Sequence, residues 1–107
     1  MHTVVINRKK WLRGEQNSKL RKPNGKKCCI GFLATALGAT NRQITNISTL
    51  EEICGSNKRY IDFNMNYSYP LAEAYDSNDD SSINDTVGEK KLRTIGKQMG
   101  VRFQFIN

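Results

Sequence analysis

The stretch from Cys29 to Leu37 (CIGFLATAL) is the most apolar part of the chain. Its large apolar side chains follow helical spacing, and Gly38 is suited to close a helix in the left-handed conformation. Only 37% of the 107 residues are hydrophobic, so the chain has material for one modest core. We therefore predict a single domain over residues 1–107 that packs around this one buried helix.

The two ends of the sequence carry the clearest strand patterns. His2 to Asn7 (HTVVIN) is rich in β-branched residues, and Val101 to Ile106 (VRFQFI) alternates apolar with polar side chains. A second helix is expected to begin at Asp85 or Thr86 and to run through Met99. These patterns predict a small α+β domain with a short antiparallel sheet, formed by the N- and C-terminal strands, and two main helices.

The middle of the chain is more polar. Pro23-Asn24-Gly25 is a strong turn signal, and the patterns at 40–43 and 48–51 both match a helix capping box. Residues 56–85 are rich in Asn, Asp, Ser and Tyr. We expect a long polar loop there, with room for one short strand at Tyr60 to Phe63.

Positive charge is concentrated near the N-terminus. The formal net charge is +7, but residues 1–27 carry +8, residues 28–88 carry −5 and residues 89–107 carry +4. Such asymmetry predicts an anionic partner, which would be a nucleic acid, a nucleotide or an acidic protein surface. The alternative is a solvated basic face that keeps the protein soluble.

Several kinds of chemistry lack the residues that they need. The single histidine is His2, and neither a P-loop nor a G-x-G-x-x-G pattern is present. Cys28, Cys29 and Cys54 are too few for a zinc site and badly spaced for a disulfide framework. With no export signal and no apolar run of about 20 residues, we expect a cytoplasmic protein with reduced thiols. We predict no catalytic residues, no metal and no cofactor.

The candidate ligand-binding residues follow from the charge. Lysine and arginine side chains would contact phosphates, and a tryptophan in the same segment would stack on a base or, equally well, seal one end of the sheet. An Asn-Asp pair near the last helix would bond a base edge or a ribose. The predicted site residues are Lys10, Trp11, Arg13, Lys26, Lys27, Asn84 and Asp85.

A set of short motifs resembles a family of small, largely uncharacterised bacteriophage-encoded proteins. The motifs are Trp11-Leu12-Arg13-Gly14, Ser18-Lys19-Leu20, Gly25-Lys26-Lys27-Cys28-Cys29-Ile30-Gly31-Phe32, Asn84-Asp85 and Gly100-Val101-Arg102-Phe103-Gln104-Phe105. The resemblance covers both ends of the chain but not the middle. It implies a phage or prophage gene that acts in a bacterial cytoplasm and, by analogy with other small basic phage proteins, a role against host defence.

These observations lead to one main hypothesis and three rivals. The main hypothesis is a non-enzymatic, homo-oligomeric protein that sequesters a phosphate-bearing nucleotide such as a cyclic nucleotide or an ADP-ribose derivative used as a host immune signal. The first rival is a nucleic-acid-binding inhibitor, although no standard DNA- or RNA-binding motif is present. The second is a protein that docks a host enzyme through its acidic central loop. An enzyme comes last, because no spacing supports one.

Overall fold

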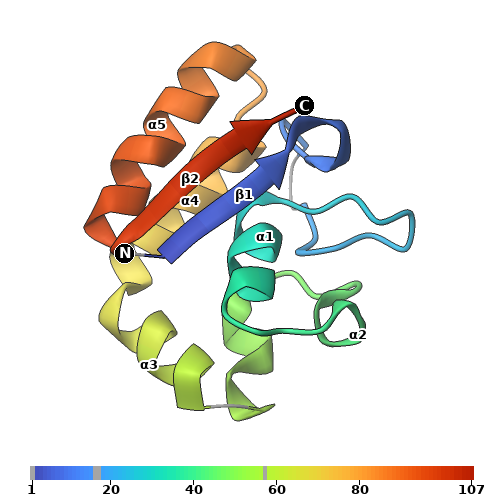
Figure 1. Cartoon of the computed structure of the whole chain (residues 1–107), viewed down its shortest axis with the longest axis vertical. Helices are drawn as coiled ribbons and strands as arrows, with labels where there is room; N and C mark the ends of the chain where they lie inside the picture. The colour runs from blue at the N-terminus through green and yellow to red at the C-terminus, as the bar shows by residue number, and fades with distance from the viewer. Residues whose placement is uncertain (1, 16–17, 57) are drawn as a thin grey trace.

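Two short strands lie side by side over a set of helices in the computed structural model (Figure 1). The structure describes residues 2–15, 18–56 and 58–107. Along the chain the elements are strand β1 (His2–Asn7), 3-10 helix η1 (Arg8–Lys10), helices α1 (Cys29–Ala36) and α2 (Asn41–Ile44), 3-10 helix η2 (Leu50–Ser56), helices α3 (Lys58–Asn66), α4 (Ser68–Asp79) and α5 (Asp85–Gln98), and strand β2 (Val101–Ile106).

The two strands lie at the predicted positions in the sequence, but their relative direction differs from the prediction. β1 and β2 pair in parallel, with His2 opposite Val101 and Asn7 opposite Ile106, so the predicted antiparallel sheet is wrong. Parallel strands need a long crossover connection. The helical chain between β1 and β2 supplies one and returns behind the sheet, so that both strands point the same way (Figure 1).

The core lies between the inner face of the sheet and the helices. Val4 and Ile6 of β1 are buried, as are Val101, Phe103 and Phe105 of β2, while the residues between the latter three face solvent. Helix α1 packs against β1 and α4, and α5 packs against α4 and β2. The predicted buried helix at the centre of a single α+β core is therefore confirmed.

The region predicted as a long polar loop is mostly helical. α3 occupies the predicted short strand, and α4 follows it almost directly. α4 buries Leu71, Ala74 and Asn78, which share one face of the helix. Pro70 is the third residue of α4, where its missing N–H removes no intrahelical bond. The expectation of two main helices is corrected accordingly, since α3 and α4 join α1 and α5.

The helix starts agree only in part with the sequence patterns. Thr40 and Gln43 form the predicted reciprocal capping box at the start of α2. In the second pattern, the backbone N–H of Ser48 donates to the carboxylate of Glu52, and a 3-10 helix follows. Helix α5 is capped by Asn84, one residue before the predicted start, because the Asn84 side chain accepts a hydrogen bond from the amide of residue 87.

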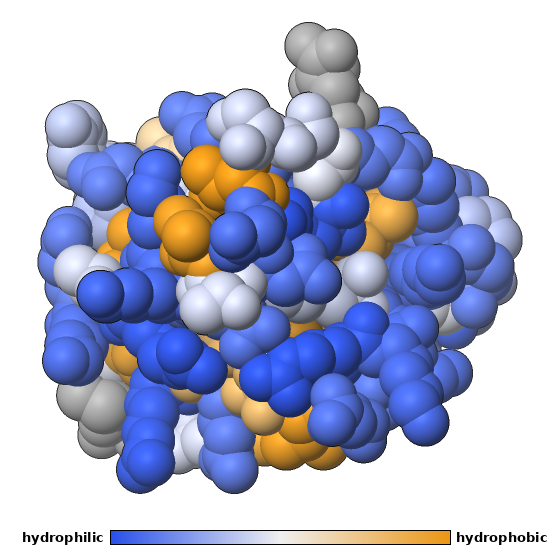
Figure 2. Space-filling model, turned by 90° about the horizontal axis from the view of Figure 1, so that it is seen from above, coloured by the Kyte–Doolittle hydropathy of each residue, from blue (hydrophilic) through white to orange (hydrophobic). Residues whose placement is uncertain are grey.

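The surface is largely hydrophilic on the face seen from above. Figure 2 shows mostly charged and polar side chains there, interrupted by small, separate apolar areas. In the described part of the chain, no helix has the length and the apolar character that crossing a membrane would require.

Candidate anion-binding surface

Two basic stretches that are distant in sequence lie side by side. After η1 the chain runs next to Lys27, whose N–H donates to the carbonyl of Lys10 at 2.9 Å. The carbonyl of Lys27 in turn accepts from the amide of Leu12 at 2.7 Å. The predicted turn at 23–25 makes this approach possible, because Gly25 adopts a φ of 89° and lets the chain reverse between Lys22 and Lys26. Backbone bonds thus fix the relative positions of these lysines.

Three cations form the centre of this surface, and we call Lys10, Arg21 and Lys27 the cationic cluster. Burial lowers the pKa of Lys27, and the charges of Arg21 and Lys10 lower it further. Lys27 Nζ donates to the hydroxyl of Thr35 at 2.9 Å and lies 5.5 Å from the centre of the Phe32 ring. The cluster therefore keeps like charges close together around a half-buried ammonium group.

The cationic cluster has no acidic partner among the described residues. Arg21 donates to the hydroxyl of Thr45 at 2.9 Å. This acceptor is neutral, as is the Thr35 hydroxyl that accepts from Lys27. The ion pairs of the N-terminal segment are instead made by Arg8, Arg13 and Lys22. A group of cations without acidic partners raises the local positive potential, which makes this surface the candidate for an anion-binding site.

Further cations extend the surface beyond the cluster. Lys9 and Lys26 are exposed and form no ion pair with the described residues, while Lys22 pairs with Glu15 at 2.7 Å. Arg21 is the one cluster member that sequence reasoning missed, although it lies in the basic segment. Its position among lysines in the sequence could have suggested Arg21 as a site residue. Only the fold shows which of these cations act on Lys27.

Three of the predicted site residues use their side chains for hydrogen bonds within the fold. Arg13 donates to the carboxylate of Asp85 at 2.7 Å and to the carbonyl of Ile83 at 2.6 Å, and its side chain is only 11% exposed. Asn84 caps α5. These contacts hold the segment 80–85 against the Trp-Leu-Arg-Gly motif, and the structure brings Arg13 and Asp85 together as an ion pair.

Trp11 lies at the edge of the core. Its ring contacts Phe105 at a centroid distance of 5.0 Å, and its Nε1–H donates to the side chain of Asn78 at 2.8 Å. Both the ring and the N–H therefore have partners within the fold. Of the two roles that the sequence leaves open for Trp11, this arrangement favours the core aromatic over the ligand-stacking one.

A buried asparagine connects the sequence motifs. Asn78 Oδ1 accepts from Trp11 Nε1 and from the backbone N–H of Cys29, and Nδ2 donates to the carbonyl of Leu12. The neighbouring carboxylate of Asp79 accepts a hydrogen bond from Ser18. The short motifs at 11–14, 18–20 and 25–32 thus meet at Asn78, a residue that the sequence analysis assigned to a loop. No local pattern around it predicts this role.

The adjacent cysteines are inside the fold. Cys28 and Cys29 are buried free thiols, and burial raises the pKa of Cys28 to about 11. Burial also raises the pKa of Cys29 well above its ordinary value. The described residues contain no group of three or more His, Cys, Asp or Glu placed to hold a metal ion. Thiols that are buried and protonated react poorly as nucleophiles or metal ligands.

The two thiols should resist alkylation in the folded state. In a Cys54→Ser variant, where Cys28 and Cys29 are the remaining thiols, we expect negligible reaction with a thiol reagent at pH 8 and reaction of two thiols per chain after addition of denaturant. Absorbance of the released thiolate gives the count. Fast reaction of either thiol in the native protein would contradict their buried position.

Comparisons with protein-family models, with curated proteins and with solved structures gave no match.

Proposed function

We propose that this protein is a non-enzymatic binding protein that sequesters a phosphate-bearing nucleotide at the cationic cluster. In this proposal Lys10, Arg21 and Lys27 contact phosphate oxygens, and the exposed Lys26 lies at the rim. The proposal places the protein in the cytoplasm of a phage-infected bacterium, where removal of a nucleotide signal would weaken host defence.

The observation that carries this proposal is the environment of Lys27. Its ammonium group is half-buried and close to two other cations, and both effects lower its pKa. Folding therefore brings together charges that repel one another, without an acidic residue among the described ones to offset them. A bound phosphate would remove this repulsion and would accept charge-assisted hydrogen bonds from the same groups.

The half-buried Phe32 adds a second element to the site. Its ring lies beside Lys27 and packs against the core. In the proposal this ring replaces Trp11 as the aromatic surface next to the phosphates, because Trp11 is engaged with Phe105 and Asn78. An aromatic face beside cations suits a nucleotide, whose base can stack while its phosphates are neutralised.

A nucleic acid is the second candidate ligand. Exposed cations are also present outside the cluster, at Lys9 in η1 and at Lys26 in the turn. A phosphate backbone would contact more of them, and its affinity would fall steeply with salt concentration. The two ligands are therefore separated by ligand length and by salt dependence.

The test compares two double variants that remove the same charge. In Lys10→Gln/Lys27→Gln the cluster loses two of its cations, whereas in Lys90→Gln/Lys91→Gln two exposed cations of α5 are removed. Cyclic dinucleotides, ADP-ribose derivatives and a short DNA duplex are screened by thermal shift and titrated by calorimetry. A ligand at 100 times its Kd should stabilise the wild-type fold by about 2.7 kcal/mol, which corresponds to several degrees.

We expect the cluster variant to bind its ligand at least about tenfold more weakly, and the α5 variant to bind like wild type. Without ligand, the cluster variant should be no less stable than wild type, because it removes repulsion around Lys27. Equal losses in both variants would show that net charge alone is responsible. Absence of any nucleotide or duplex that binds the wild-type protein would overturn the proposal.

A further inference from the structure

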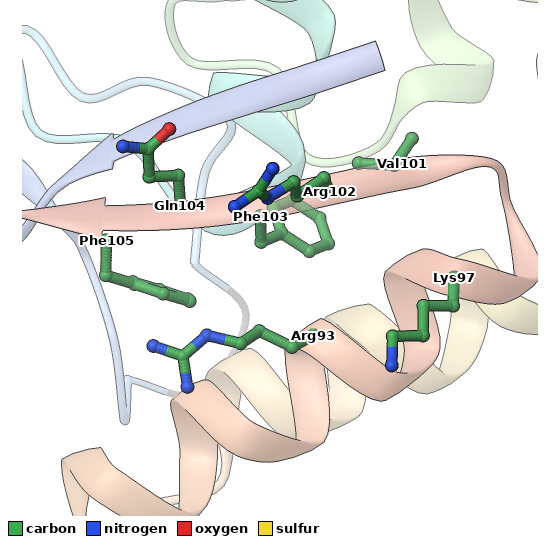
Figure 3. A pocket seen from close by; sticks show the side chains of 7 residues that line it. All are labelled: Arg93, Lys97, Val101, Arg102, Phe103, Gln104 and Phe105. Atoms are coloured by element: carbon green, nitrogen blue, oxygen red, sulfur yellow. The ribbon is translucent and has the colours of Figure 1, made fainter. Parts of the chain in front are cut away.

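A groove separates β2 from α5 on the side of β2 that faces away from β1 (Figure 3). Its volume is about 340 Å³. Phenylalanine rings from β2 point toward the helix, and the Arg93 side chain extends along α5 to the side of the groove where Phe105 lies. The groove is lined by Arg93, Lys97, Val101, Arg102, Phe103, Gln104 and Phe105.

The strand presents unpaired backbone groups to this groove. The N–H of His2 donates to the carbonyl of Gly100, and the register places Val4 opposite Phe103. In a parallel ladder, alternate residues of a strand bond to the strand on one side, and the residues between them point to the other side. In this register Arg102 and Gln104 bond to β1. The backbone groups of Phe103 therefore point to the opposite edge of β2. Outside the ladder, no described residue bonds the backbone groups of Phe103 or Phe105.

Most of the surface of these two residues is buried. Phe103 is 2% exposed and Phe105 is 8% exposed. A strand edge that retains unpaired N–H and C=O groups is a template for another strand. Closer to the start of β2, α5 itself approaches the edge, since a Cβ on Gly96 would lie 2.8 Å from the carbonyl oxygen of Val101.

The groove is also strongly positive. Arg93 and Lys97 are four residues apart on α5 and therefore project from the same side of the helix. Arg93 lies 5.3 Å from the centre of the Phe105 ring and makes a 3.4 Å contact with Glu89, which is already bonded by Arg8. Among the described residues, Lys97 and Arg102 form no ion pair. Cations therefore flank the open edge.

We propose that the groove binds an extended, acidic segment of a partner protein, which adds to the sheet as a third strand beside β2. The backbone of the segment would pair with the free groups of Phe103 and Phe105. Successive side chains of a strand point to opposite faces, so acidic residues at alternate positions would meet Arg93 and Lys97 on one face, and the remaining residues would lie near Arg102.

Charge also decides between this partner and a second copy of the chain. In a symmetric pair joined through β2, each copy would bring Arg93, Lys97 and Arg102 to the same seam, and like charges would face one another. An acidic segment would instead meet cations on both sides. The positive charges around β2 therefore favour a partner of opposite charge over self-association.

The test uses a fluorescent eight-residue peptide in which glutamate alternates with valine. A second peptide has the same sequence with N-methyl groups on alternate residues, so that it keeps the charges but cannot donate the ladder hydrogen bonds. Fluorescence anisotropy measures binding to wild type, to Arg93→Gln/Lys97→Gln and to the matched double variant Lys90→Gln/Lys91→Gln. Amide NMR signals of the wild-type protein report where the peptide binds.

We expect the first peptide to bind wild type and the α5 control alike, and to bind R93Q/K97Q about tenfold more weakly. N-methylation should weaken binding by a similar factor or more, and the amide signals of Phe103 and Phe105 should shift while that of Val5 does not. The proposal is overturned by absence of binding at millimolar peptide, by equal binding of the two peptides, or by signal changes at Val5 alone. A dimer that R93Q/K97Q dissociates would also overturn it, in favour of self-association.

Discussion

Replacing Asn78 with alanine is expected to lower the free energy of unfolding strongly. Asn78 is 1% exposed, and its side chain bonds Trp11 Nε1, the N–H of Cys29 and the carbonyl of Leu12. The alanine variant leaves these groups without partners inside the fold. Each such group costs about 1–3 kcal/mol, so we expect a loss of roughly 4 kcal/mol or more in the free energy of unfolding.

A loss of that size would be a large part of the total stability of a domain of this length, which is on the order of 5–15 kcal/mol. Urea denaturation followed by circular dichroism measures it. Asn66→Ala, at an exposed position of α3, is the control and should change the stability by less than about 0.5 kcal/mol. A small effect at Asn78 would show that the three motif segments hold together without it.

An isosteric change at the same position separates shape from hydrogen bonding. The N78D carboxylate can still accept from Trp11 and Cys29, but it cannot donate to Leu12 and it adds a charge beside Asp79. Burial and the like charge would raise its pKa in the folded state. The variant should therefore be markedly less stable than wild type at pH 7, and this difference should shrink as pH falls from the raised folded-state pKa toward the pKa of an unfolded aspartate.

The second large effect is expected for Gly31→Ala. A Cβ on Gly31 would lie 1.8 Å from the carbonyl oxygen and 2.7 Å from the carbonyl carbon of Leu20. These are backbone atoms, so α1 or the segment containing Leu20 must move to admit the methyl group. Gly31 and Leu20 are both buried. Overpacking of this kind typically costs about 1–3 kcal/mol and occasionally more, so we expect a loss of at least about 3 kcal/mol in the free energy of unfolding.

Gly88→Ala is the matched control, because it makes the same change inside another helix. There a Cβ would approach its nearest neighbour, Arg13 Nε, no closer than 3.6 Å, which is ordinary contact. Alanine is favoured over glycine in a helix by about 1 kcal/mol, so this variant should be neutral or more stable. Thermal unfolding of both variants tests the contrast. Equal effects would mean that close packing of α1 against Leu20 is not what requires glycine.

The parts of the fold that sequence alone predicts are those with a strong local pattern. β2 alternates apolar and polar side chains, α1 is almost wholly apolar, and α5 has a regular apolar face. The direction of the sheet could not be predicted, because alternation is the same in parallel and antiparallel strands. α3 and α4 were missed since each buries only a few side chains among many polar ones.

The candidate site was predictable as a region but not in its composition. The concentration of basic residues near the N-terminus indicates a cationic surface, and Lys10 and Lys27 lie on it. That Arg21 joins them, and that Arg13 is paired with Asp85, depends on contacts between segments distant in sequence. Local spacing holds no information on such contacts, and the role of Asn78 was hidden for the same reason.

The pairing of β1 with β2 has a consequence for biosynthesis. β1 is made first, yet its ladder partner is made more than 90 residues later, so Val4 and Ile6 have no strand to pair with until residues 101–106 have left the ribosome. Until then the nascent chain exposes a β-branched strand of the kind that chaperones cover and that aggregates form. We therefore expect the docking of β2 to be the closing step of folding.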